Sequence, residues 1–299
     1  MSGFSADWLY LREPFDHAAR ETITAALDLP GRLARWRKRS PGEALAVIDL
    51  ACGHGANLRV LAPALSGAQH WRLVDHDSAL LDAVPDALDA WARRHGYRFT
   101  LEHRVGDAQA IDIAGSDFHA RVVCQRLDLA RDLASLDFGQ APLVTACALL
   151  DLVSASWLQA LINKARAARA ALLFGLTVDG RTAWSPADPG DETVHELFRQ
   201  HQRRDKGFGP ALGSQAAAVA VQQLACAGYE TLQTQTDWVI DGALAPQMQR
   251  AMIEGMAAAA LEQDPAPEGA VRSWAARRGA GIGSSRLRVG HVDLVAEPA

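Results

Sequence analysis

Four cysteines stand far apart in this chain of 299 residues, at Cys52, Cys124, Cys147 and Cys226. No two of them form a C-x-x-C pair, which excludes a zinc knuckle and a thiol redox motif, so no metal site is expected. Isolated thiols within apolar runs are typical of buried residues in a reducing compartment.

Lysine is also scarce, with three residues, and the net charge is −5. Such a chain lacks the clustered cationic surface that nucleic-acid binding needs. No apolar run approaches the roughly 18 residues of a membrane helix, and seven charged side chains within the first thirty residues argue against a secretory signal. We therefore expect a cytoplasmic protein that binds neither nucleic acid nor a membrane.

Short apolar runs alternate with helical patterns along most of the chain. Runs such as 44–50, 142–147 and 171–177 are bounded by turn residues, which predicts strands buried on both faces. Between them apolar residues recur at helical spacing, as in 79–95. This alternation predicts one doubly wound α/β domain over residues 1–299, with a mostly parallel seven-stranded sheet.

Four segments depart from the simple alternation. Residues 1–42 predict a helical N-terminal extension, and 98–113 predict a small inserted hairpin. The last two strands, near 229–240 and 287–295, predict an antiparallel hairpin at the sheet edge. Residues 179–215 are predicted to be an irregular insertion on the side where a substrate would enter.

The turn after the first strand contains two glycines that suit a close approach to a ligand. In an open α/β sheet, ligands bind beyond the carboxyl ends of the strands. A dinucleotide-binding turn needs G-x-G-x-x-G, and both possible registers here lack at least one required glycine. The phosphate-binding G-x-x-x-x-G-K-[ST] pattern is absent too. We therefore expect a ligand without a diphosphate, which disfavours an NAD(P) oxidoreductase.

The sequence VIDLACGHGANL at 47–58 closely resembles the first motif of class I methyltransferases that use S-adenosylmethionine (SAM), V-L-D-[LV]-G-x-G-x-G. Ala51 replaces the first glycine, which is tolerable if its φ is negative. The resemblance implies that the other two glycines bring the main chain close to the methionine end of SAM, and that Asp49 accepts a hydrogen bond from the ammonium group or its bridging water. The residues it assigns to this turn are Asp49, Ala51, Cys52, Gly53, Gly55 and Asn57.

A second segment, 73–81, resembles the family's second motif. Asp75 ends the second strand, and the resemblance implies that it accepts hydrogen bonds from the ribose hydroxyls. His76 is expected to cover the adenine edge. Asp77 or Ser78 is expected to cap the helix that follows.

Two aspartates are candidates for the acidic side chain that meets the adenine amino group in this family. Asp128, followed by Leu129, is preferred because it lies just ahead of the strand that begins at Pro142. Asp107 has an equally suitable local sequence. It can meet the adenine only if residues 110–126 are an insertion into the regular order of strands and helices.

Residues 143–153 resemble the family motif that follows the acidic residue at the adenine. Pro142 stands where this motif usually begins with an acid. The resemblance implies that Ala146 and Leu149 flank the cofactor. It also implies that an arginine of the N-terminal helix binds the cofactor carboxylate. Arg20 is the candidate for this role, with Arg12 as the alternative.

Methyl transfer from a sulfonium is an in-line displacement, which needs alignment of the reacting groups and exclusion of water. A nucleophile that arrives protonated also needs a general base. His201 is the predicted base. Asp151 is a weaker candidate, because a carboxylate at its ordinary pKa is a poor base.

The resemblance covers residues 45–178 well and implies a SAM-dependent methyltransferase. The absence of an N-P-P-[YF] motif disfavours methylation of adenine N6 or glutamine, and the acidic charge disfavours RNA. A small-molecule acceptor with an oxygen, nitrogen or carbon nucleophile is therefore expected. The alternative is a protein of the same fold that binds SAM or a related nucleoside without turnover.

Overall fold

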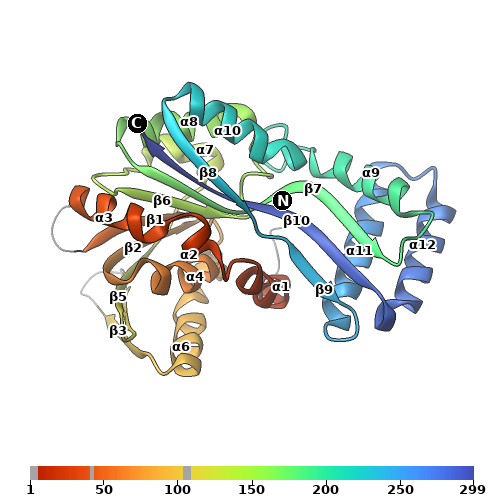
Figure 1. Cartoon of the computed structure of the whole chain (residues 1–299), viewed down its shortest axis with the longest axis horizontal. Coiled ribbons are helices and arrows are strands. Elements are labelled where there is room, and N and C mark those ends of the chain that lie inside the picture. The colour runs from red at the N-terminus through yellow and green to blue at the C-terminus, as the bar shows by residue number, and fades with distance from the viewer. Residues whose placement is uncertain (1–5, 41–43, 104–108) are drawn as a thin grey trace.

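The computed structural model describes residues 6–40, 44–103 and 109–299, in which ten strands form one sheet (Figure 1). In chain order the strands are β1 (Leu45–Leu50), β2 (Gly67–Asp75), β3 (Arg98–His103), β4 (Gln109–Ala114), β5 (Phe118–Arg126), β6 (Leu143–Cys147), β7 (Ala171–Ser185), β8 (Tyr229–Gln235), β9 (Trp238–Asp241) and β10 (Arg286–Pro298). Across the sheet their order is β3-β4-β5-β2-β1-β6-β7-β10-β8, and β9 pairs with β10.

Twelve α-helices surround the sheet in the described ranges. They are α1 (Ala6–Ala19), α2 (Ile23–Ala26), α3 (Leu29–Arg39), α4 (Ala56–Leu65), α5 (Ser78–Asp82), α6 (Val84–His95), α7 (Leu129–Asp132), α8 (Ala155–Ala167), α9 (Asp191–Gln202), α10 (Ala216–Cys226), α11 (Pro246–Gln263) and α12 (Glu268–Ala280). Among the described residues, none of these helices has the length and apolar character needed to cross a membrane.

Seven of the strands form the predicted doubly wound core, in the order β5-β2-β1-β6-β7-β10-β8. The first five of these are parallel, and β10 runs antiparallel to both β7 and β8. The antiparallel edge is therefore confirmed. The predicted hairpin is also present, as β3 and β4, and it extends the sheet because β4 pairs antiparallel with β5.

The expectation of an irregular segment at 179–215 is wrong. β7 continues to Ser185, and α9 follows at Asp191–Gln202. The helical signal was present in the sequence, because Val194, Leu197 and Phe198 are spaced to share one face and they join a buried apolar cluster. Charged residues between them obscured this pattern.

Three apolar clusters hold the molecule together. One fills the space between the sheet and helices α8 and α10, and a second lies on the opposite face under α3, α4 and α6. The third joins the outer halves of β7 and β10 to β9, α9, α11 and α12. These outer elements project from the main sheet (Figure 1), and we call them the distal lobe.

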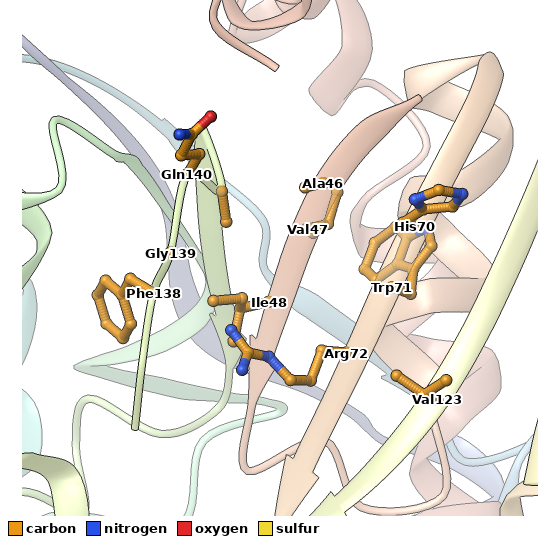
Figure 2. A pocket seen from close by; sticks show the side chains of 11 residues that line it. Ala46, Val47, Ile48, His70, Trp71, Arg72, Val123, Phe138, Gly139 and Gln140 are labelled. Carbon is orange, nitrogen blue, oxygen red and sulfur yellow. The ribbon is translucent and has the colours of Figure 1, made fainter. Parts of the chain in front are cut away.

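One face of the sheet is left open beside β1 and β2. A hollow of about 310 Å³ lies there, and Figure 2 shows Ile48, Arg72 and Phe138 around it. It is lined from the sheet face and from the loop before β6, not from the turn after β1. The hollow is therefore separate from the predicted ligand site.

Candidate active site

The turn after β1 is built from left-handed backbone. Gly53 has φ +55° and Gly55 has φ +82°, as a ligand-approaching turn requires. Ala51 also lies in the left-handed region, with φ +52°. The condition that its φ stays negative is therefore wrong, and Ala51 adopts the strained conformation for which the family motif uses glycine.

Asp49 lies at the centre of a fully buried hydrogen-bond network. The side-chain amide of Asn57 donates to Asp49 Oδ1 at 2.8 Å and to Thr145 Oγ1 at 3.1 Å. Arg20 Nη1 donates to the other end of the same amide, at 2.9 Å from Asn57 Oδ1. Side chains from β1, α4, β6 and the turn after α1 thus meet at one point, although their sequence positions are up to 125 residues apart.

Arg20 is buried and paired with a residue from the far end of the chain. Its Nε donates to Asp293 Oδ2 at 2.7 Å, and the other carboxylate oxygen accepts from Leu176 N and Thr236 Oγ1. Gly175 leaves room for the guanidinium, because a methyl group there would lie 2.8 Å from its carbon. Arg20 is therefore held rigidly beside Gly175 of β7, level with the end of β6.

Two charged atoms of this network have no partner among the described residues. They are Asp49 Oδ2 and Arg20 Nη2, both shielded from solvent. Burial raises the pKa of Asp49 to about 7, against the lowering effects of Asn57 and Arg20. A buried charged group without a partner is costly, so its presence indicates a place for a ligand.

Asp75 ends β2 beside the glycine turn. Its Oδ2 accepts from Gly53 N at 2.8 Å and its Oδ1 from Asp77 N at 3.0 Å. The ring of His76 lies 3.2 Å from Asp75 Oδ1 and is more than half exposed. Each carboxylate oxygen keeps further acceptor capacity, so Asp75 both shapes the turn and remains able to bind hydroxyl groups. Asp77 caps α5, as predicted.

The structure places Asp128 directly after β5, where its side chain caps α7 by accepting from Ala130 N at 3.0 Å. Leu129 beside it is buried. Asp107 lies outside the described residues. The assignment of the adenine contact to Asp128 stays a prediction.

The segment after β6 brings another carboxylate to the same edge of the sheet. Ala146 in β6 and Leu149 after it are buried, and their contact with the cofactor stays a prediction. Asp151 follows them, and its Oδ1 is shielded without a partner among the described residues. Burial is the largest effect on Asp151 and raises its pKa to about 6. The argument that Asp151 has an ordinary pKa is therefore wrong.

Helix α1 covers this part of the molecule. Leu9 lies 3.4 Å from the position that a Cβ on Gly53 would take, and Tyr10 stacks on His54 at 4.6 Å. Glu13 clamps the helix in place through two hydrogen bonds to Arg59, at 2.6 and 2.8 Å. We call the residues beneath and within α1 the covered site: Arg12, Arg20, Asp49, Asn57, Asp75 and Asp151.

Arg12, the alternative to Arg20, lies on α1 between Asp16 and Trp238 of β9. Its Nε donates to Asp16 at 3.0 Å, and its guanidinium carbon lies 5.1 Å from the Trp238 ring centre. Trp238 Nε1 also donates to Asp16, at 3.0 Å. Both arginines therefore belong to the site, with Arg20 nearer Asp49 through Asn57.

His201, the predicted base, lies on α9 in contact with α11. Its Nε2 is 3.2 Å from Glu262 Oε2, and burial lowers its pKa. Arg204 binds the same carboxylate. These contacts hold His201 in the distal lobe, and its role as a base stays a prediction.

Sequence reasoning missed two residues that complete the network, Thr145 and Asp293. Both lie in mostly apolar strand sequences, LVTAC and VGHVDLV. A polar residue within a strand buried on both faces must find a partner, and this signal could have identified them. Their partners come from distant segments that no local pattern connects.

No protein-family model matches the sequence, and no curated protein sequence matches it. Among solved structures, it is similar to a cyclopropane-fatty-acyl-phospholipid synthase-like protein from Lactobacillus casei, with a TM-score of 0.53 and 16% identity over 98% of this chain and 94% of that one.

Two further structures overlap less closely. They are an O-methyltransferase family protein from Burkholderia thailandensis (TM-score 0.44, 14% identity, 96% of this chain and 60% of that one) and the magnesium protoporphyrin IX methyltransferase from Synechocystis with bound SAH (0.42, 14%, 79% and 83%). The Lactobacillus structure, with a TM-score above 0.5, supports a comparison of folds. The chain shares its overall fold with that protein, and the α/β fold implied by the resemblance to class I methyltransferases is confirmed.

Proposed function

We propose that this protein binds SAM in the covered site and transfers its methyl group to a small-molecule acceptor. One observation carries the proposal: a buried carboxylate oxygen of Asp49 and a buried guanidinium nitrogen of Arg20 lack partners on either side of Asn57. The amino-acid end of SAM carries an ammonium and a carboxylate. These two groups would satisfy Asp49 and Arg20 respectively.

The nucleoside part of SAM would lie against the glycine turn and the ends of the neighbouring strands. Asp75 would accept from the ribose hydroxyls with its free lone pairs, while Gly53 and Gly55 present bare main chain. His76, Asp128 and Leu129 lie at the ends of the neighbouring strands, where the adenine would extend. No diphosphate is required, in keeping with the absent phosphate-binding pattern.

When bound, SAM supplies an activated methyl group on a sulfonium. The protein needs to align the acceptor and exclude water. Helix α1 provides a cover for this purpose, since Leu9 and Tyr10 pack over the glycine turn. Entry of the nucleoside requires these side chains to move away from Gly53, and the Glu13–Arg59 pair would be the contact to break.

The proposal is tested by comparing how SAM, S-adenosylhomocysteine (SAH) and NAD change the melting temperature. A ligand at 100 times its Kd stabilises the folded state by about 2.7 kcal/mol. SAM and SAH should stabilise the protein, and NAD should not. Asp75→Ala should abolish the shift with SAM, because the ribose loses its acceptor.

Asp77→Ala is the matched control. It removes the helix cap, at a cost of about 1 kcal/mol, and should keep the shift with SAM. Normal SAM affinity in Asp75→Ala would contradict the placement of the ribose. Incubation of the wild type with methyl-labelled SAM and a panel of acceptors then separates an enzyme from a protein that binds SAM without turnover.

A further inference from the structure

The charges beneath α1 do not balance. Two buried arginines, Arg12 and Arg20, are paired with Asp16 and Asp293. Asp49 and Asp151 are also buried and have no cationic side chain hydrogen-bonded to them among the described residues. If the ammonium of SAM satisfies Asp49, the carboxylate of Asp151 remains.

Asp151 is held in a fixed position. Its backbone oxygen accepts from Gly213 N at 2.9 Å, and two residues later Val153 O accepts from Leu212 N at 2.9 Å. Ser154 then caps α8 by accepting from Trp157 N. The carboxyl group is therefore presented by a rigid segment, as a binding residue requires.

A further buried polar atom without a partner in the described part of the chain lies on β7, the strand next to β6. Thr177 Oγ1 is buried and has no hydrogen-bond partner among the described residues. Thr177 lies two residues beyond Gly175, which is the register partner of Cys147 on the adjacent strand. Arg12 acts electrostatically on Asp151 from α1.

We propose that Asp151 binds the methyl acceptor and that this acceptor is an amine, which makes the protein a nitrogen methyltransferase. The inference rests on the proposed function. An ammonium group supplies the missing positive charge and hydrogen-bond donors together. A neutral alcohol would leave the charge of Asp151 uncompensated.

With Asp151 as the proton acceptor, the atoms and charges of methyl transfer to an amine balance. In a site that excludes water, both members of an ammonium–carboxylate pair are disfavoured, so the proton moves from nitrogen to Asp151 and frees the nitrogen lone pair. The lone pair forms the N–C bond while the C–S bond breaks and sulfur keeps its electron pair. Positive charge passes from sulfur to nitrogen, and no further reactant is needed. The raised pKa of Asp151 brings it nearer to that of an amine.

A competing role for Asp151 is to neutralise the sulfonium of SAM. The two roles differ in which ligand loses affinity when the charge is removed. Asp151→Asn should leave the Kd values of SAM and SAH within about threefold of wild type if Asp151 binds the acceptor. A loss of SAM affinity with normal SAH affinity would overturn the proposal.

The direct experiment uses the full chain saturated with SAH and pairs of probes with the same shape: benzylamine and benzyl alcohol, and cyclohexylamine and cyclohexanol. Calorimetry should show the amine of at least one pair binding 10-fold or more tightly than its alcohol, and Asp151→Asn should remove this preference. Glu254→Gln, which removes an exposed carboxylate on α11, should keep it. Equal binding of amine and alcohol in every pair would overturn the inference.

Transfer of labelled methyl groups provides the second readout. Amines should accept the label, and Asp151→Asn should lower kcat/KM at least 50-fold, with partial recovery in Asp151→Glu. Labelling of alcohols or phenols in preference to amines would overturn the inference and leave the proposed function intact. Failure of the wild type to bind SAM or SAH would instead overturn the proposed function.

Discussion

The covered site and the distal lobe bury charge in different ways. In the distal lobe the buried Arg278 is paired with Asp191, and at the surface the half-exposed Arg277 binds Asp188 through two hydrogen bonds of 2.7 Å. In the covered site, atoms of Asp49, Arg20 and Asp151 remain without partners among the described residues. Because burial of an unpaired charge opposes folding, the covered site reserves these groups for ligands, whereas the lobe uses its charges for stability.

Within the described ranges, the distal lobe also contains buried polar atoms without hydrogen-bond partners, but they belong to a different kind of group. Trp184 Nε1 and His195 Nε2 are shielded there without partners among the described residues. Both belong to groups that are neutral in this setting, since burial lowers the pKa of His195. A neutral donor or acceptor costs much less to bury than a charge. The lobe therefore tolerates these atoms without a ligand.

The largest expected effect comes from breaking a matched pair in the lobe. Asp191 accepts from Arg278 and from Trp274 Nε1 at 2.8 Å. Asp191→Asn should lower the free energy of unfolding by about 3 kcal/mol, because the buried Arg278 loses its counter-charge. Urea unfolding measures the loss. SAM affinity should not change, and a large decrease in that affinity would show that the two regions are not independent.

In the covered site, removing a buried charge should instead raise the free energy of unfolding. The folded-state pKa of Asp49 is about 7, against 3.8 for an ordinary aspartate, so the free energy of unfolding should fall as pH rises from about 4 to about 7. At pH 8, Asp49→Asn should raise the free energy of unfolding by roughly 1–2 kcal/mol by removing the buried charge, while SAM binding weakens. At pH 4 the variant and the wild type should differ little. A destabilised variant at pH 8 would contradict the comparison.

The smallest effect concerns the turn itself. Ala51 has φ +52°, so Ala51→Gly should relieve strain and raise the free energy of unfolding by about 1 kcal/mol. Ala46→Gly, in the regular part of β1, is the matched control and should lower it by about 0.5–1 kcal/mol. Thermal unfolding of both variants provides the measurement. Equal losses in the two variants would show that Ala51 is not strained.

The sequence predicted the site residues that lie within short local motifs. Asp49 and Asp75 were identified from the resemblance to the family's first two motifs, and parallel strands bring their carboxyl ends to one edge of the sheet. The backbone angle of Ala51 could not be read from residue types, since alanine normally avoids positive φ. The whole seven-stranded core was predicted from the alternation of strands and helices. The strands appear in the sequence as short apolar runs, and the helices as apolar residues at helical spacing.

Contacts between distant segments were beyond sequence reasoning. Nothing near Arg20 indicates Asp293, 273 positions later, and nothing near Gly53 indicates that Leu9 covers it. The pKa of Asp151 depends on burial by the surrounding fold, which the sequence does not display. Likewise, only the packing of α9 on α11 reveals that His201 meets Glu262.

The most direct test of the central claim is a crystal structure of the protein grown with SAH. We expect the ribose on Asp75, the ammonium on Asp49 Oδ2, the carboxylate on Arg20 Nη2, and Leu9 displaced from the glycine turn. A structure at saturating SAH in which these atoms remain unpartnered and α1 keeps its place over Gly53 would contradict the account.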